Sequence, residues 1–155
     1  MFPDTHVLQT RGTQARIDQL IIRIKAIGCR ITPQRVALLQ LVLTSQEHLT
    51  VEQIYAKVKA DFPMTSLATV YNTLTLLKEM GEVLEIDLGH KGSHYDGYRV
   101  EPHPHIICIK CNAVNDADIP ILQSISQEMI RSTGYEILSH RLDFFGICPQ
   151  CQSDG

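Results

Sequence analysis

The sequence lacks the long apolar run that a membrane-spanning helix requires. Such a helix takes roughly 18 to 20 consecutive apolar residues, and the longest run here, VALLQLVL, is interrupted by Gln40. The N-terminal stretch MFPDTHVLQTRGTQ has neither a basic start nor an apolar signal core. Because 44% of the residues are hydrophobic, the chain can still form a core. We therefore expect a soluble, cytoplasmic protein with no membrane partner.

An overall positive charge, which is typical of nucleic-acid-binding proteins, is also missing, because the formal net charge is -3. The total conceals an uneven distribution. Residues 1–80 contain nine Lys and Arg against six Asp and Glu, whereas residues 81–155 contain five against eleven. Unless this split is due to chance, contacts with phosphates belong to the first half, and the carboxylates of the second half serve another purpose.

A disulfide framework is not expected, because the cytoplasm keeps thiols reduced. Of the five cysteines, Cys29 stands alone and the other four form two pairs separated by 36 residues: Cys108-x2-Cys111 and Cys148-x2-Cys151. Four thiolates suit a closed, tetrahedral structural Zn site without catalytic activity. The alternative is a redox motif of the thioredoxin type, but neither pair begins a helix in a βαβ unit.

The first half is predicted to form helices followed by a hairpin. Helices are expected over 15–27, from Thr32-Pro33 to about residue 43, after the capping box Thr50–Gln53, and from about Ser66 to Gly81. Alternating apolar residues from Leu84 and a turn at 89–92 then predict the hairpin. This is the order of a winged helix-turn-helix, in which the helix before the hairpin enters the DNA major groove.

The helix before the hairpin has an apolar face and a polar face. The apolar face consists of Leu67, Val70, Leu74 and Leu77. The polar face can bond phosphates and base edges, although an ordinary solvated helix face would look the same; it consists of Ser66, Thr69, Tyr71, Asn72, Thr73 and Thr75.

The second half is predicted to be a small α/β domain. Strands are expected over 103–109, 113–116 and 135–146, with a helix over about 120–132. Its small size and long apolar strand suggest that it completes its core by pairing with a second copy. The fold class is therefore α+β, a winged-helix domain followed by an α/β dimerisation domain with a small antiparallel sheet. The expected divisions are a flexible tail (1–14), the DNA-binding domain (15–96) and the dimerisation and metal-binding domain (97–155).

The stretch HPHIICIKC predicts two metals rather than one. Side chains alternate along a strand, so His103 and His105 point to one face and Cys108 to the other. Imidazoles and carboxylates accept Fe(II), Mn(II), Zn or Ni, and the ligand types do not choose among them. Further candidate ligands for this metal are the nearby carboxylates Asp96, Glu101 and Asp116. Two histidines more distant in the sequence, His140 and His48, are also candidates.

Four motifs together resemble the ferric uptake regulator family: TPQR at 32–35, SLATVYNTL at 66–74, HPHIICIKC and CPQC at 148–151. The resemblance covers about residues 15–151. It implies a metal-dependent transcriptional repressor, not an enzyme, which binds double-stranded operator DNA as a homodimer. The expected DNA contacts are Arg35, Ser66, Thr69, Tyr71, Asn72 and Thr75. Relatives often have arginine at the position of Thr75, which affects operator preference.

Within the family, the pattern is most similar to the peroxide-sensing branch. The resemblance implies a regulatory Fe(II) or Mn(II) held by His48, Asp96, His103, His105 and Asp116. Iron-sensing relatives tend to have glutamate at position 96 and a carboxylate at the position of Pro104. The segment from Asp96 to His103 is one residue longer than in peroxide sensors, so Glu101 or His94 could replace Asp96. His140 matches a further metal ligand of some members, or has a structural role.

The resemblance also implies a mechanism. His48 belongs to the DNA-binding half, so a metal that needs all five ligands would fix the relative orientation of the two domains and favour the DNA-binding state. Five ligands leave one position open on Fe(II), where peroxide could react and oxidise His48 or His103, whereas Mn(II) would not support this reaction. The alternatives are a repressor that senses iron, zinc or nickel, and a metalloenzyme. The enzyme is disfavoured because the sequence offers no separate nucleophile or acid–base pair.

Overall fold

The computed structural model describes residues 5–117, 119 and 121–153, and the chain divides into two compact units, residues 1–100 and 101–155. Residues 1–4 of the predicted tail lie outside the described part. From Thr5 onward the chain is helical, so the first helix begins earlier than the apolar pattern predicted. The described part of the chain contains no helix that is both long and apolar enough to cross a lipid bilayer.

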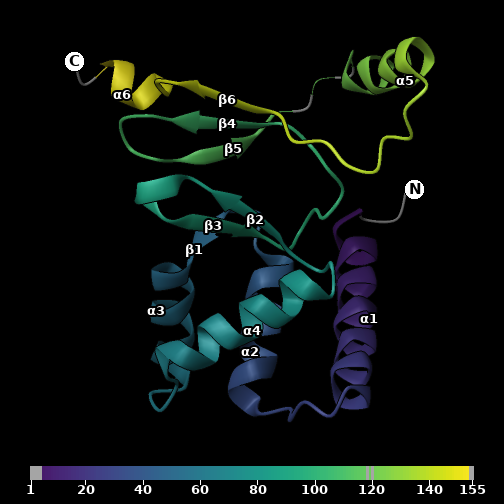
Figure 1. The fold of residues 1–155 in the computed structure, drawn as a ribbon. Coiled ribbons are helices and arrows are strands. Elements are labelled where there is room, and N and C mark those ends of the chain that lie inside the picture. The colour runs from purple at the N-terminus through teal and green to yellow at the C-terminus, as the bar shows by residue number, and fades with distance from the viewer. Residues whose placement is uncertain (1–4, 118, 120, 154–155) are drawn as a thin grey trace. The chain divides into compact units, whose positions relative to one another are not determined.

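The described residues of the first unit, 5–100, form four α-helices and a three-stranded sheet (Figure 1). In chain order its elements are α1 (Thr5–Ala26), α2 (Pro33–Thr44), β1 (Leu49–Thr50), α3 (Val51–Asp61), α4 (Leu67–Glu79), β2 (Leu84–Asp87), the 3-10 turn η1 (Gly89–Lys91) and β3 (Ser93–Asp96). Strand β3 lies between β1 and β2 and is antiparallel to both. The predicted order of helices followed by a hairpin is confirmed.

Local sequence signals set the starts of the helices. The Thr32 side chain accepts a hydrogen bond from the Arg35 amide at the start of α2, and Thr50 and Gln53 form the predicted capping box of α3. Ser66 likewise caps α4 through the Thr69 amide. Each such cap contributes about 1 kcal/mol, because it satisfies an amide that the helix leaves without an internal partner.

The helices of the first unit bury a continuous apolar core. Its members come from α1 to α4 and from the strands, and include Ile17, Leu20, Ile24, Leu38, Leu39, Ile54, Val70, Leu74 and Leu77. Two positions of α4 differ from the prediction. Leu67, in the first turn, is 44% exposed. Thr73 is fully buried because its hydroxyl donates to the Thr69 carbonyl, which satisfies the polar group inside the core.

The second unit is a small α/β module. It comprises β4 (His105–Cys108), β5 (Val114–Asp116), α5 (Ile121–Thr133), β6 (Asp143–Gly146) and α6 (Pro149–Ser153). Strand β4 lies between β5 and β6. It is antiparallel to β5 and parallel to β6, so the predicted α+β class is confirmed but the sheet is mixed. The long connection through α5 allows β6 to return parallel to β4.

The predicted strand over 135–146 is wrong except at its end, since residues 134–142 have no regular secondary structure. The second unit consequently has little apolar core. Among its described residues, only Ile107 and Cys108 are buried hydrophobic side chains. Helix α5 stands apart from the sheet in Figure 1, and Ile121, Ile125 and Met129 along it are about half exposed or more. This unit therefore needs stabilisation from outside its own packing.

Candidate metal centres and the DNA-contact face

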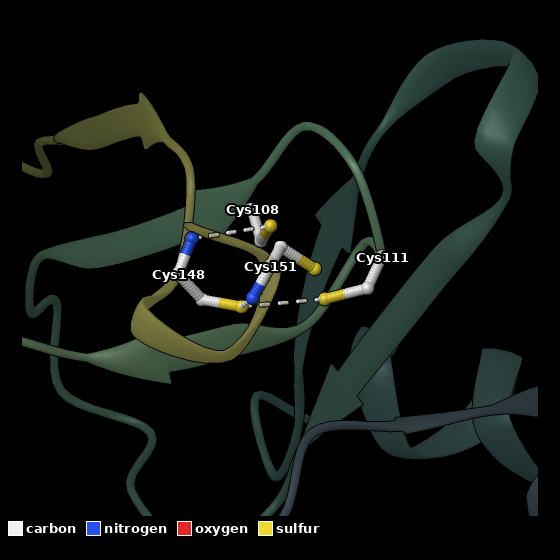
Figure 2. A group of neighbouring side chains, drawn as sticks. All are labelled: Cys108, Cys111, Cys148 and Cys151. Carbon is white, nitrogen blue, oxygen red and sulfur yellow. Dashed lines mark hydrogen bonds between the residues drawn. The ribbon is translucent and has the colours of Figure 1, made fainter. Parts of the chain in front are cut away.

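The four paired cysteines converge within the second unit. Cys108 ends β4, and a turn through Asn112, whose φ of 61° is left-handed, follows Cys111. Cys148 follows β6, and Cys151 lies in α6. Figure 2 shows the four side chains gathered with their sulfur atoms toward a common centre. Antiparallel and parallel pairing on β4 therefore bring together cysteines that are far apart in the sequence.

The distances fit a tetrahedral metal. The four sulfur atoms lie within 4.8 Å of one another, and those of Cys111 and Cys148 are 3.8 Å apart. Zinc–sulfur bonds of about 2.3 Å place the sulfurs of a regular tetrahedron about 3.8 Å apart. The cluster is consistent with structural zinc. Cys29 is separate from it and packs, half buried, against the core of the first unit.

Hydrogen bonds give the thiols unequal acidity. Bonds from the backbone amides of Cys111 and Cys148 lower the pKa of Cys108 to about 6. Side-chain hydrogen bonds with Cys148 and Cys111 raise the pKa of Cys151 to about 12. Adjacent thiolates repel one another, so all four ionise together only when a cation compensates their charge.

A second group of donors in this unit consists of His103, His105 and Asp116. The antiparallel register of β4 and β5 places His105 directly opposite Asp116. The Asp116 Oδ1 atom lies 3.0 Å from Nε2 of His103 and 4.0 Å from Nε2 of His105. The imidazole rings are buried and their centroids are 4.4 Å apart. Two imidazoles and one carboxylate thus present their donor atoms to a common point.

The surroundings of His103 are those of a cation ligand. Its Nδ1 lies 2.8 Å from the Glu101 carbonyl oxygen, which can only accept, so Nδ1 carries the proton and Nε2 faces Asp116. Because a carboxylate oxygen is also an acceptor, the close contact at Nε2 requires a proton or a metal cation. The donor types and their convergence therefore fit a divalent metal.

In the first unit, the sheet brings His48 and Asp96 together. Leu49 pairs with Tyr95, so the residues one step outward, His48 and Asp96, come next in the same antiparallel register. His48 Nε2 lies 3.7 Å from Asp96 Oδ2, and both side chains are almost fully buried. A buried imidazole beside a buried carboxylate is again a pair of potential ligands.

The turn after β3 holds Asp96 in this position. Its Oδ1 accepts the amides of Tyr98 and Arg99 at 2.9 and 3.1 Å, which directs Oδ2 toward His48. Gly97 lies so close to α2 that an added Cβ would be 2.8 Å from the Val42 carbonyl oxygen. Only glycine allows this approach, and the sequence reasoning did not identify it.

The remaining ligand candidates lie elsewhere. Glu101 contributes its backbone carbonyl to His103, and its side chain is exposed, as is that of His140. His94 is buried within β3, where burial lowers its pKa. Sequence reasoning also missed Asp143, at the start of β6, whose Oδ1 lies 3.5 Å from Nδ1 of His105. The only signal for it was an acidic residue opening the apolar run FFGI.

The polar side chains of α4 form the candidate DNA-contact face. Tyr71, Asn72 and Thr75 are exposed, whereas Ser66 and Thr69 bond each other at the helix start. Arg35 donates to the Arg30 carbonyl at 2.6 Å and to Thr73 at 3.4 Å, and so links α2 to α4. A pocket of about 300 Å³ lies between the starts of these helices.

Comparisons with known proteins give a consistent assignment. The model of the ferric uptake regulator family matches residues 26–145. The peroxide-responsive repressor PerR of Staphylococcus aureus (strain USA300) is 33% identical over 145 residues, which cover 94% of this chain and 97% of the repressor.

Solved structures show the same fold. The ferric uptake regulator Fur of Helicobacter pylori matches with a TM-score of 0.82 at 24% identity, over 90% of this chain and 93% of that one. The ferric uptake regulator from Francisella tularensis with iron matches with a TM-score of 0.70 at 28% identity, over 81% of this chain and 96% of that one. With a cysteine cluster suited to zinc and histidine–carboxylate groups suited to a regulatory metal, the chain belongs to the ferric uptake regulator family of metal-dependent transcriptional repressors.

Proposed function

We propose that this protein is a cytoplasmic, peroxide-responsive repressor that binds double-stranded operator DNA as a homodimer. The histidine–carboxylate groups described above are the observation that carries the proposal. The 33% identity to a peroxide-responsive repressor over nearly the whole chain supports this branch of the family. Two sequence features agree with it, the aspartate at position 96 and the proline between His103 and His105.

The regulatory metal, Fe(II) or Mn(II), would take its ligands from both units: His48, Asp96, His103, His105 and Asp116. The first unit offers one imidazole and one carboxylate, and the second offers two imidazoles and one carboxylate. Metals of this class commonly take five or six donors, so neither group fills the coordination sphere alone. Sharing a metal would complete both.

A shared metal would connect metal binding to DNA binding. Ligands on both sides of the unit boundary restrict the orientation of the winged helix relative to the dimerisation unit. A dimer restrained in this way holds two α4 helices at a fixed spacing, which must match the spacing of two operator half-sites. The metal favours the DNA-binding state because it binds more tightly to that state. Allosteric coupling of ordinary size would raise the DNA affinity by about 5-fold to 150-fold.

The second unit carries the proposed homodimer contact. Ile121, Ile125 and Met129 recur every fourth residue on α5 and are exposed, as are Phe144 and Phe145 on β6. A helix with an uncovered apolar stripe gains stability when it packs against another apolar surface. A second copy is the occupant that we propose, because it would also supply the core that this unit lacks.

Peroxide sensing would use the same ligands. Fe(II) held by these residues would supply the electron that activates peroxide, and the imidazoles of His48 and His103 are the proposed targets of the resulting oxidation. Mn(II) would be bound by the same donors without this oxidation. The residues of the chain hold the cation, and the burial of His48 and His103 limits their oxidation to reagents generated beside them.

The proposal is tested by operator binding of the zinc-loaded protein with and without Mn(II), comparing His48→Ala with His90→Ala. His90 is an exposed histidine of the η1 turn and serves as the matched control. We expect Mn(II) to raise DNA affinity at least fivefold in the control and to have no effect in His48→Ala. An equal metal response in both variants would contradict the shared site. No specific DNA binding by either would contradict the repressor assignment.

A further inference from the structure

We propose that Asp143 is a positioning residue for the regulatory metal site: it holds the His105 ring so that Nε2 is presented to the cation. This inference rests on the proposed function, because it concerns the same site. Asp143 is not one of the five proposed ligands. Its role follows from the order of strands in the second sheet.

The sheet places His105 between two carboxylates. Strand β5 sets Asp116 opposite His105 on one side, and β6, parallel to β4, sets Asp143 opposite it on the other. Nε2 of His105 lies 4.0 Å from Asp116 Oδ1, and Nδ1 lies 3.5 Å from Asp143 Oδ1. The two ring nitrogens therefore face different carboxylates.

This arrangement selects one tautomer. A neutral imidazole carries one proton, and a carboxylate near Nδ1 favours the form in which Nδ1 carries it, which leaves the Nε2 lone pair for a metal. Metal-binding histidines commonly donate their second N–H to a carboxylate or a carbonyl, and this bond fixes the orientation of the ring. His103 has the carbonyl version of this contact, through Glu101. Asp143 places a carboxylate oxygen 3.5 Å from Nδ1 of His105, a separation that a small shift of either side chain would shorten into the carboxylate version of this contact.

Asp143 is itself held in place. Its side chain is 11% exposed, and its Oδ2 accepts from Arg141 Nε at 2.5 Å. Arg141 occupies one oxygen, which leaves Oδ1 directed at the imidazole. The pair Arg141–Asp143 at the start of β6 thus aligns a residue of the neighbouring strand β4.

The test measures Mn(II) affinity and the His105 tautomer in the zinc-loaded full chain. Three variants are compared with the wild type: Asp143→Ala, Asp143→Asn, and the control Glu128→Ala, which removes an exposed ion pair to Arg131 in the same unit. Two-dimensional ¹H–¹⁵N spectra of the imidazole nitrogens report the tautomer before Mn(II) is added. Zinc content reports whether the second unit is folded.

We expect Asp143→Ala to weaken Mn(II) binding by about 10-fold to 100-fold and to remove the preference of His105 for the Nδ1–H form. Asp143→Asn, whose amide oxygen still accepts from Nδ1, should recover most of the affinity, and the control should match the wild type. Unchanged affinity and tautomer in Asp143→Ala would overturn the proposal. An equally large loss in Asp143→Asn with an unchanged tautomer would also overturn it, because Asp143 would then act as a charged ligand.

These readouts separate this inference from the proposed function. The tautomer is measured without regulatory metal or DNA, so it is informative even if the protein fails to repress in response to peroxide. Conversely, a correct tautomer with no specific operator binding would contradict the proposed function alone.

Discussion

Removing the structural zinc should unfold the second unit and leave the first unit folded. The perturbation is Cys151→Ser, or treatment with a chelator, and the control is Cys29→Ser, which changes a cysteine outside the cluster. The expectation follows from the unequal cores. The first unit has a large apolar cluster contributed by four helices, whereas Ile107 and Cys108 are the only buried hydrophobic side chains among the described residues of the second.

The free energy of zinc binding is much larger than the free energy that apolar burial contributes to the second unit. Burying a side chain such as Ile107 contributes about 1.5 to 3 kcal/mol. A structural zinc contributes about 10 to 16 kcal/mol of apparent binding free energy, which is as large as the whole stability of an ordinary domain, about 5 to 15 kcal/mol. Loss of the metal should therefore exceed what the remaining contacts of the second unit can supply.

Amide hydrogen exchange followed by mass spectrometry resolves the two units. In Cys151→Ser, amides of β4 and β6 should lose their protection while those of α2 to α4 keep it, and Cys29→Ser should resemble the wild type. The protein should also lose its dimeric state, because the proposed contact lies in the second unit. Retained protection of β4 and β6 in a zinc-free protein would refute the reasoning.

Three further predictions concern separate contacts. Gly97→Ala should lower the free energy of unfolding by about 1 to 3 kcal/mol and weaken Mn(II) binding, because the added Cβ would lie 2.8 Å from a backbone oxygen of α2. Thermal unfolding and Mn(II) titration measure the two effects. The control is Gly12→Ala, where an added Cβ meets open space. The hydrogen bond from Lys78 in α4 lowers the pKa of Glu85 in β2 from its usual 4.5. This contact between α4 and β2 therefore stabilises the first unit fully above pH 4.5, and less as the pH falls through the lowered pKa. The melting temperature of Glu85→Gln should therefore lie below that of the wild type at neutral pH and equal it in acid. A difference in melting temperature that stays the same at both pH values would contradict this prediction. Ile125→Glu should give a monomer in sedimentation, and a persistent dimer would exclude α5 from the interface.

Local signals in the sequence predicted the first unit well. Thr32, Thr50 and Ser66 each begin a helix where their side chains predicted it, because capping depends on residues only two or three positions away. Leu67 and Thr73 of α4 show where apolar periodicity fails as a guide to burial, because the predicted apolar residue Leu67 is exposed and the predicted polar residue Thr73 is buried. Burial in the first turn depends on neighbouring helices, and a threonine can be buried when it bonds its own helix.

Features that depend on long-range pairing were not predictable. The strand predicted over 135–146 is confined to Asp143–Gly146, because pairing with β4 extends only over His105–Cys108. The position of Asp143 beside His105 follows from that parallel register, which no local pattern in the sequence reveals. The closeness of Gly97 to α2 is likewise a tertiary contact. The proposed ligands, by contrast, came from motifs whose spacing resembles that of a known family.

The central claim is most directly tested by operator binding of Fe(II)-loaded and Mn(II)-loaded protein, with and without peroxide, followed by peptide mass spectrometry for added oxygen on His48 and His103. We expect peroxide to release DNA from the iron-loaded protein only, with oxygen added to one or both histidines. Equal release from both metal forms would contradict the account. So would binding that depends only on which metal is supplied and leaves both histidines unmodified, which is the behaviour of a sensor of metal availability.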